Sequence, residues 1–487
     1  MTDFHTIRAG ERTIAVRKDL RVPMRDGVEL AVDTYEGPDA KPRPALIAMS
    51  AYGKELQALA LTTPPQRRPS PMWDGRIEAG DIARVVDEDY VHVIGDMRGT
   101  GDSGGVMIVN YSFGGVSQGQ DLYDLIEWVA AQPWCDGNVG MIGISYLGAT
   151  QVLAAAERPP HLKAIFVSGG HSDFYETTYH GGVMWFMLMN LLDGHIELFD
   201  VLKGPKKLEI GSDPPMQSRP WVEEHDTMFR WYEYWLKGID NGIMDEPAVS
   251  TFVEGTREVV TSAQWPPKEI EYRSLSLRPR GKLSFEPEPL GAEYAAPDGF
   301  YQAPLTVTDE VRMLSWSTGP FEAPTELIGT GAAHLFAEID QTDTNFILRL
   351  WDETPGGSRQ LITSGYLKAS HRELDEERTT EGNPYHPHTR AVPVEPGKTE
   401  EYVLRLYPFA ATFQPGHRLV VALANNEPLA DAHNALLPPD AFHLPVGRPV
   451  THKIHRDAAH PSRLVLPFTV TAAPDARSRP SATPRTG

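Results

Sequence analysis

Cysteine is nearly missing from this sequence of 487 residues, since Cys135 is the only one. A lone thiol excludes a disulfide-bonded scaffold and a cysteine-rich metal site, and it gives no reason to expect an oxidising compartment. Long hydrophobic runs are missing as well. The longest covers residues 183–192 and is interrupted by Asn190, whereas a membrane-spanning helix needs about 20 apolar residues. Because the N-terminal stretch also has no apolar core of signal-peptide length, we expect a cytoplasmic protein without membrane partners.

Positive charge is in short supply. The chain holds 45 Lys and Arg residues against 66 Asp and Glu residues, a formal net charge of −21. Such a surface repels phosphate backbones and anionic lipids, so we expect no nucleic-acid partner. Apolar residues at 41 % and charged residues at 23 % are typical of a soluble globular protein and exclude general disorder.

Residues 1–258 alternate short apolar runs with amphipathic segments. In residues 121–131, for example, Leu122, Leu125, Ile126 and Val129 share one helix face. We expect strands at 45–50, 90–96, 139–143, 162–168, 183–190 and 206–211, and helices at 121–131, 146–157 and 223–237. The length of the 183–190 segment fits a helix almost as well. Alternating strands and helices predict a mostly parallel sheet covered on both faces.

The texture changes after residue 258. Residues 259–472 carry short β-branched and aromatic runs separated by Gly, Pro, Asn and Asp, and helical periodicity is nearly absent. The clearest runs are 334–339, 345–351, 401–406, 418–422 and 463–468. This pattern predicts an all-β sandwich or jelly-roll domain. Residues 473–487, rich in Pro, Ser and Arg, are expected to be disordered.

The strongest chemical signal is Gly143-Ile-Ser145-Tyr-Leu-Gly148 between a predicted strand and a predicted helix. This is the context of a nucleophile elbow, in which a tight turn exposes the serine hydroxyl at the carboxyl edge of a sheet. We expect glycine at both positions because the residues two before and three after the serine approach each other's backbone. The alternative is a glycine-rich turn with a serine of no chemical role.

A serine nucleophile needs a base and an acid, which follow it in the chain order Ser, Asp or Glu, His. The candidate acid is Asp193, just after the 183–190 segment, with Asp173 as its competitor; Asp193 could instead cap a following helix. The candidate base is His225, the first histidine after the strand expected to end at Gly211. A structural histidine would occupy the same position. His171, His180 and His195 are the other histidines considered.

Two further patterns fail their structural tests. Residues 99–104 match G-x-G-x-x-G after a strand, but no helix pattern follows, so a dinucleotide site is not expected. His386 and His388 lie two apart in a proline-rich loop, which makes a poor metal pair. We therefore expect no cofactor and no metal.

Several longer motifs resemble the CocE/NonD family of hydrolases, the group of cocaine esterase, α-amino-acid ester hydrolases and X-Pro dipeptidyl-peptidases. They are AYGK at 51–54, DMRGTGDSG at 96–104, QPWCDGNVGMIGISYLG at 132–148, WLKG at 235–238 with EP at 246–247, GYLKASHR at 365–372, FQPGHR at 413–418 and HPSRLVLP at 460–467. The resemblance covers most of the chain and implies an α/β-hydrolase domain followed by a β jelly-roll. It implies Ser145 as nucleophile of a serine esterase or dipeptidyl-peptidase. It also implies an oxyanion hole made by the Tyr52 hydroxyl and the Tyr146 backbone N–H.

The sequence departs from the family twice. Relatives carry their catalytic histidine in a Gly-Pro-Trp-x-His segment after the last strand, where this chain reads GSDPPM at 211–216. Relatives also insert a sizeable helical cap before the triad acid, where this chain has only residues 174–192. We expect a small ester, amide or short peptide as substrate. The alternative is an impaired hydrolase fold that acts as a binding or scaffold protein. A shortened cap would expose apolar surface around residues 183–192 and favour a homo-oligomer.

Overall fold

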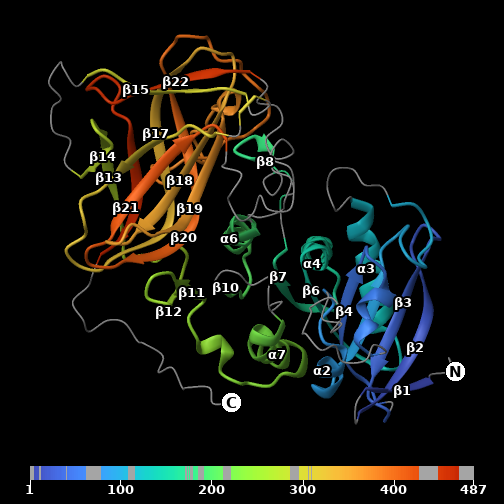
Figure 1. Ribbon diagram of the computed structural model, residues 1–487. Coiled ribbons are helices and arrows are strands. Elements are labelled where there is room, and N and C mark those ends of the chain that lie inside the picture. The colour runs from blue at the N-terminus through green and yellow to red at the C-terminus, as the bar shows by residue number, and fades with distance from the viewer. Residues whose placement is uncertain are drawn as a thin grey trace. The chain divides into compact units, whose positions relative to one another are not determined.

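The computed structural model describes residues 5–9, 12–39, 41–61, 78–107, 116–170, 173, 175, 179–184, 191–211, 221–285, 295–304, 307–308, 310–426 and 448–470, and the structural statements below refer to these residues. The chain divides into two compact units (Figure 1). The first unit comprises Met1–Phe174, Glu197–Leu202 and Asp213–Glu246, and the second comprises Tyr175–Ile196, Lys203–Ser212 and Pro247–Gly487.

A seven-stranded sheet forms the centre of the first unit, with the order β1-β2-β3-β5-β4-β6-β7. Its strands are β1 (His5–Ala9), β2 (Arg12–Pro23), β3 (Glu29–Glu36), β4 (Arg43–Ser50), β5 (Val91–Asp96), β6 (Cys135–Ile144) and β7 (Leu162–Ser168). Strands β5, β4, β6 and β7 are parallel to one another, whereas β1, β2 and β3 pair in antiparallel fashion. Both faces of the parallel strands are buried, because β4 and β5 are buried at every residue.

Helices cover both faces of this sheet. They are α1 (Lys54–Gln57), η1 (Leu59–Leu61), α2 (Ile82–Asp87), α3 (Val116–Ala130), α4 (Tyr146–Glu157) and α7 (Trp221–Lys237). Helix α3 packs on α4, while α2 lies beside α7, where the Arg84 guanidinium lies 5.7 Å from the centre of the Phe229 ring (Figure 1). The connections through α2 and through α3 run in opposite directions along the sheet. Since such crossovers are right-handed, they lie on opposite faces.

The first unit confirms most of the expected elements. Helix α4 and strand β7 have the predicted bounds, and α3 begins five residues earlier than expected. Gly238 follows α7 with φ 68° and ends the helix as a left-handed residue.

The predictions for 183–190 and 206–211 are corrected. Of the first segment, β9 (Val183–Met184) is a two-residue strand paired with β8 (Tyr179–His180), and residues 185–190 lie outside the described part of the chain. The second segment forms β10 (Leu208–Ile210), which pairs with β11 (Val249–Val253) in a separate small sheet rather than extending the main sheet. Local hydrophobicity predicts a strand but not its pairing partner, which explains the error.

Mostly antiparallel strands form the second unit. Beyond β11 they are β12 (Glu258–Ser262), β13 (Ile270–Arg278), β14 (Lys282–Ser284), β15 (Asp298–Gln302), β16 (Leu314–Ser317), β17 (Thr325–Ile339), β18 (Asn345–Glu353), β19 (Arg359–Lys368), β20 (Glu400–Phe413), β21 (Arg418–Ala424), β22 (Val450–His455) and β23 (Arg463–Thr469). Strand β23 pairs with both β13 and β17, so the ladder closes on itself. Its inward side chains, such as Phe346, Leu404 and Leu466, form one apolar core.

The expected architecture, a mostly parallel sheet flanked by helices followed by an all-β domain, is therefore confirmed. All five predicted β runs lie within strands. The tail at 473–487 lies outside the described residues. Among the helices of the described part, none is both long and apolar enough to cross a membrane.

Candidate active site

The carboxyl ends of the parallel strands gather polar residues at one edge of the first unit's sheet. Ser50 ends β4, Asp96 ends β5, and Ser168 ends β7. Ser145 follows the last residue of β6 and precedes α4. In open α/β sheets this edge is where ligands bind.

Ser145 has a backbone conformation that few residues other than glycine adopt, with φ 58° and ψ −120°. Its N–H donates to the Ser168 carbonyl over 3.0 Å, and its own carbonyl accepts the N–H groups of Gly148 and Ala149. Bonds on both sides hold the turn open between strand and helix. Such strain persists only where the surrounding structure imposes it, and it is concentrated at functional sites.

Glycine is required on both sides of this turn, although not because the two glycines face each other. A Cβ on Gly143 (φ 150°) would lie 2.3 Å from the Leu147 Cβ, and one on Gly148 would lie 2.9 Å from the Ser168 carbonyl oxygen. The first glycine thus makes room for the new helix, and the second allows that helix to contact the end of β7. The predicted need for glycine is confirmed, and its cause is corrected.

The structure brings Tyr52 and Tyr146 together. Their ring centres lie 5.9 Å apart with the planes inclined at 62°. Tyr146 is buried and begins α4, so its backbone N–H belongs to the first turn, where N–H groups point out of the helix N-terminus. Tyr52 follows β4 and is 46 % exposed, and its N–H donates to the Ser50 hydroxyl over 3.0 Å. The side chains of the two residues predicted to supply the oxyanion hole are therefore neighbours.

A buried lysine anchors the loop that carries Tyr52. The Lys54 side chain is fully buried, and its ammonium nitrogen lies 2.8 Å from Asp19, 2.9 Å from Asp102, 3.4 Å from Glu55 and 3.5 Å from Asp33. Burial lowers the pKa of this ammonium, but the hydrogen bonds to Asp19 and Asp102 and the charge of Asp33 outweigh burial and raise it. Lys54 therefore stays charged and cross-links segments that lie far apart in the sequence.

Asp96 holds the same loop through the backbone. Its buried carboxylate accepts the N–H of Lys54 over 2.6 Å and the N–H of Asp102 over 2.9 Å. Burial raises the pKa of this carboxyl, against the effect of the two N–H donors. A Cβ on Gly101 (φ 50°) would lie 2.1 Å from its oxygen, so glycine is needed there. Within the 99–104 segment, Gly101 thus makes room for the Asp96 carboxylate.

Gln57 connects the end of β4 to the end of β6 at this edge of the sheet. Its side chain is fully buried. The amide nitrogen lies 3.4 Å from the Ser50 hydroxyl, and the amide oxygen accepts the N–H groups of Glu78 and Ala79, each over 3.0 Å. The Glu78 carbonyl in turn accepts the N–H of Ile144, the residue before Ser145. One side chain therefore connects the hydroxyl that holds the Tyr52 N–H to the strand end that carries the serine.

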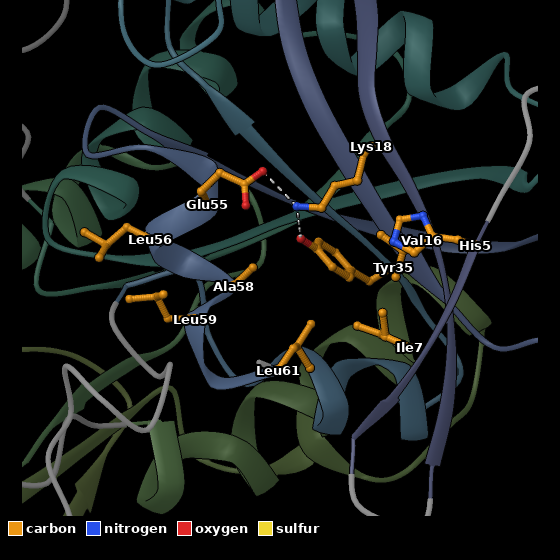
Figure 2. Close-up of a pocket in the computed structure, with 10 residues that line it drawn as sticks. All are labelled: His5, Ile7, Val16, Lys18, Tyr35, Glu55, Leu56, Ala58, Leu59 and Leu61. Atoms are coloured by element: carbon orange, nitrogen blue, oxygen red, sulfur yellow. Dashed lines mark hydrogen bonds and ion pairs between the residues drawn. The ribbon is translucent and has the colours of Figure 1, made fainter. Parts of the chain in front are cut away.

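A cavity of about 390 Å³ lies beneath α1 in the same unit (Figure 2). Apolar side chains line most of it, and Lys18 closes one end, with its ammonium 3.0 Å from Glu55 and 3.4 Å from the Tyr35 hydroxyl. In Figure 2, Ala58, Leu59 and Leu61 lie on one side of the space, and Ile7 and Val16 lie on the other. Neither Tyr52 nor Ser145 is among its lining residues. The cavity thus adjoins α1 and η1, which follow the loop that carries Tyr52.

The candidate acid and base lie in different units. His225 is the fifth residue of α7 in the first unit, and its ring centre lies 5.7 Å from that of Phe229. Asp193 is the third residue of α6 (Leu191–Val201) and belongs to the second unit. It lies inside the helix rather than at its N-cap, and its side chain is outside the described part. Asp173, its competitor, is exposed and follows β7 in the first unit.

The other histidines have different surroundings. His180 is buried in the second unit against the rings of Tyr366 and Tyr407. His195 lies in α6 and is half-buried. His171 lies outside the described residues.

Sequence reasoning identified the residues at the turn but missed their supports. Lys54 and Asp96 stood inside the quoted motifs, yet nothing local shows that either side chain is buried. Gln57 carried no signal, since its partners lie 7, 21 and 22 residues away. Among the described residues, one group of three side chains could hold a metal ion, namely His455, Asp457 and His460 in the second unit.

Comparison with known families matches both parts of the chain. Residues 26–241 match the family model of the X-Pro dipeptidyl-peptidase (S15 family), and residues 241–465 match that of the X-Pro dipeptidyl-peptidase C-terminal non-catalytic domain. Among curated proteins, the chain is similar to the cocaine esterase of a Rhodococcus species. The two are 25 % identical over 601 aligned positions that cover 93 % of this chain and 98 % of the relative.

Solved structures share the whole fold. A CocE/NonD family hydrolase from Staphylococcus aureus superposes with a TM-score of 0.78 at 21 % identity, covering 96 % of each chain. An α-amino acid ester hydrolase superposes with a TM-score of 0.67 at 17 % identity, covering 95 % of this chain and 98 % of the other.

Proposed function

The chain belongs to the CocE/NonD family of hydrolases, and we propose that it cleaves an ester or amide through an acyl-enzyme formed on Ser145. In the first step the Ser145 hydroxyl oxygen attacks the substrate carbonyl and gives its proton to a base. The carbonyl–heteroatom bond then breaks, and the leaving alcohol or amine takes that proton. Water attacks the acyl-enzyme in the same way, releases the acid and restores the serine.

The backbone of Ser145 is the observation that carries this proposal. A non-glycine residue at φ 58° between β6 and α4 is the arrangement of a nucleophile elbow. The surrounding bonds to Ser168 and Gly148 maintain it. A serine without a chemical role would not need two flanking glycines, a buried lysine and a buried glutamine to support its neighbourhood.

Tyr52 and Tyr146 supply the oxyanion hole in this proposal. The first offers a phenolic hydroxyl and the second a backbone N–H at the start of α4. Donors held in advance stabilise the negative oxygen of the tetrahedral intermediate more than water does, because they need not reorganise during the reaction. The contact between the two rings supports their joint assignment.

His225 is the proposed base and Asp193 the proposed acid that orients it. The Lys237 ammonium donates to the Glu88 carbonyl and lies 4.0 Å from the centre of the Tyr90 ring, next to the amino end of β5. The C-terminal end of α7 therefore lies at the amino edge of the sheet. Helix α7 therefore runs antiparallel to the strands, which supports His225, near its N-terminal end, as the base for a serine at the carboxyl edge. Asp173, after β7, is the acid to test if Asp193 proves dispensable.

An open site favours a small substrate. The 601 aligned positions shared with cocaine esterase exceed the 487 residues of this chain by 114, so at least that many positions face a gap in this chain. This difference supports the shortened cap expected from the sequence. Tyr52, nearly half exposed, is accessible from solvent. We therefore propose simple acyl esters as substrates at least as readily as X-Pro peptides.

Labelling with a fluorophosphonate probe tests the proposal, with the modified residue located by peptide mass spectrometry. We expect the label on Ser145, and no label or ester turnover in Ser145→Ala. Ser117→Ala, which changes an exposed serine of α3, is the matched control and should keep both. A folded protein that takes no label at Ser145 would instead be a binding or scaffold protein with a hydrolase fold.

Two variants then test the base. Loss of labelling in His225→Gln, with retained labelling in His195→Gln, supports the proposed assignment. The reverse pattern assigns the base to His195.

A further inference from the structure

A short connection in the second unit brings three metal-ligating side chains together. His455 ends β22, Asp457 and His460 follow in the turn, and β23 begins at Arg463. One ligand atom from each of the three lies within 4.8 Å of the other two. We propose that His455, Asp457 and His460 form a zinc-binding site that fastens the β22–β23 connection.

The separations are close to those a zinc ion requires. Ligands about 2.0–2.1 Å from a tetrahedral zinc lie about 3.4 Å from one another. The Nδ1 atom of His460 lies 3.3 Å from one Asp457 carboxylate oxygen and 3.4 Å from the other. The Nδ1 atom of His455 lies 3.9 Å from the Asp457 carboxylate. Small side-chain rotations would therefore bring all three ligands to bonding distance, with a water as the fourth ligand.

The turn holds Asp457 ready for a metal. One carboxylate oxygen, Oδ1, accepts the backbone N–H groups of Ala459 over 2.8 Å and His460 over 3.0 Å. These bonds fix the orientation of the carboxylate, and Oδ2 faces the imidazole nitrogens of both histidines. A carboxylate oriented in this way loses little conformational freedom when it binds an ion.

A second set of contacts orients His455. Its other ring nitrogen, Nε2, lies 3.4 Å from the Thr399 hydroxyl and 3.9 Å from a Glu338 oxygen. Histidines that bind metals through one nitrogen usually donate a hydrogen bond from the other to a carboxylate or similar acceptor, which fixes the tautomer. Glu338 is itself held by Lys453 over 2.7 Å. The arrangement favours His455 with its proton on Nε2 and its lone pair on Nδ1.

Buried contacts fix the frame around the site. The Ser462 hydroxyl donates to the His455 carbonyl over 2.5 Å and accepts the N–H of Phe336 over 2.9 Å. Phe336 is also the register partner of His455 and packs edge-on against His460, with ring centres 5.7 Å apart. Two nitrogen ligands and one carboxylate suit zinc and its neighbours in the first transition series rather than calcium or magnesium. A bound ion would thus fasten the connection between β22 and β23, which packs against Phe336 of β17.

Calorimetric titration with zinc chloride tests this site, using the full chain without an affinity tag after dialysis against a chelator. We expect one zinc ion per chain, at least a 100-fold loss of affinity in His460→Asn, and about a tenfold loss in Glu338→Gln, which removes only the orienting carboxylate. His417→Gln is the matched control. His417 pairs with Asp352 over 2.8 Å in the same unit, and this variant should bind zinc like the wild type.

His460→Asn is the deciding variant because its side chain is 38 % exposed, so that an amide there leaves the fold intact. If that variant binds zinc like the wild type, or if the wild type binds none at 100 µM added zinc chloride, the site does not exist. Cobalt(II) bound to the wild type gives a second readout that does not depend on any variant. Visible absorption of four- or five-coordinate cobalt supports the site, and the spectrum of the hydrated ion overturns it.

Discussion

A buried glutamine fastens loops in each of the two units, and the two differ in what they hold. Gln57 connects the Ser50 hydroxyl to residues 78 and 79, next to the proposed active site. Gln302 is equally buried, but its amide accepts the Arg312 N–H over 2.7 Å and donates to the Ala303 and Glu310 carbonyls. Gln302 therefore closes only its own loop. A buried glutamine bonded to loop backbone thus supports the proposed active site in the first unit and only the stability of a loop in the second. The residues to which each glutamine is bonded make the difference.

We expect the largest difference between the units in kcat, when one phenolic hydroxyl is removed from each. Tyr52→Phe should lower kcat for an activated ester about 10²–10³-fold with little change in KM, because the hydroxyl acts on the oxyanion of the transition state. Tyr301→Phe makes the same chemical change on an exposed tyrosine of β15 in the second unit and should leave kcat unchanged. Steady-state kinetics checks both. Equal kcat values for the two variants would remove Tyr52 from the oxyanion hole.

The paired glutamines give a smaller and more selective effect. Gln57→Met leaves the N–H groups of Glu78 and Ala79 without their acceptor, and Gln302→Met does the same to Arg312. Each change should lower the free energy of unfolding by about 2 kcal/mol, measured by urea titration. Only Gln57→Met should also lower kcat per folded molecule, by roughly tenfold, since a small displacement of a donor weakens transition-state binding. If Gln302→Met lowered kcat to the same extent, the two glutamines would not differ in their effect on catalysis.

Acidification should give the smallest difference between the units, because it should lower the free energy of unfolding of both by a similar amount. Burial lowers the pKa of His92 in β5 and of His452 in β22 to about 3 in each case. Between pH 6.5 and about 3 the unfolded chain therefore binds protons that the folded chain does not. Each histidine should lower the free energy of unfolding by about 1.4 kcal/mol per pH unit as the pH falls through this range, and by nothing above it.

Unfolding followed at pH 7.5, 6 and 5 checks this expectation. In His92→Leu and in His452→Leu, the slope of the free energy of unfolding against pH should decrease by the contribution of one proton. If the units unfold in separate transitions, each variant should affect the slope of its own unit only. An unchanged slope in both variants would show that these histidines do not carry the pH dependence.

The sequence predicted the strands and helices near Ser145 because their signals are local. A buried run, two glycines and an amphipathic helix all lie within residues 139–157, and α4 has the predicted bounds. Long-range pairing was not predictable in this way. Residues 206–211 look like the next strand of the main sheet, yet β10 pairs with β11, since hydrogen bonding between strands depends on the tertiary fold.

The same distinction applies to the site. Ser145 and Tyr52 stood in motifs that can be recognised, whereas the buried contacts of Lys54 and Gln57 reach across more than 20 residues. Asp193 and His225 stay predictions. Chain order indicates an acid followed by a histidine, but two residues in different units cannot be brought together by spacing alone.

The Lys54 cluster has a consequence for attempts to evolve this protein in the laboratory. Its carboxylates come from residues 19, 33, 55 and 102, which lie in separate stretches of the sequence. Residues whose charges pair with one buried ammonium do not contribute additively. A library that randomises only residues 52–55 should therefore contain few folded members. Libraries that vary the lysine together with its distant carboxylates, or that leave all of them fixed, would search productive sequences far more efficiently.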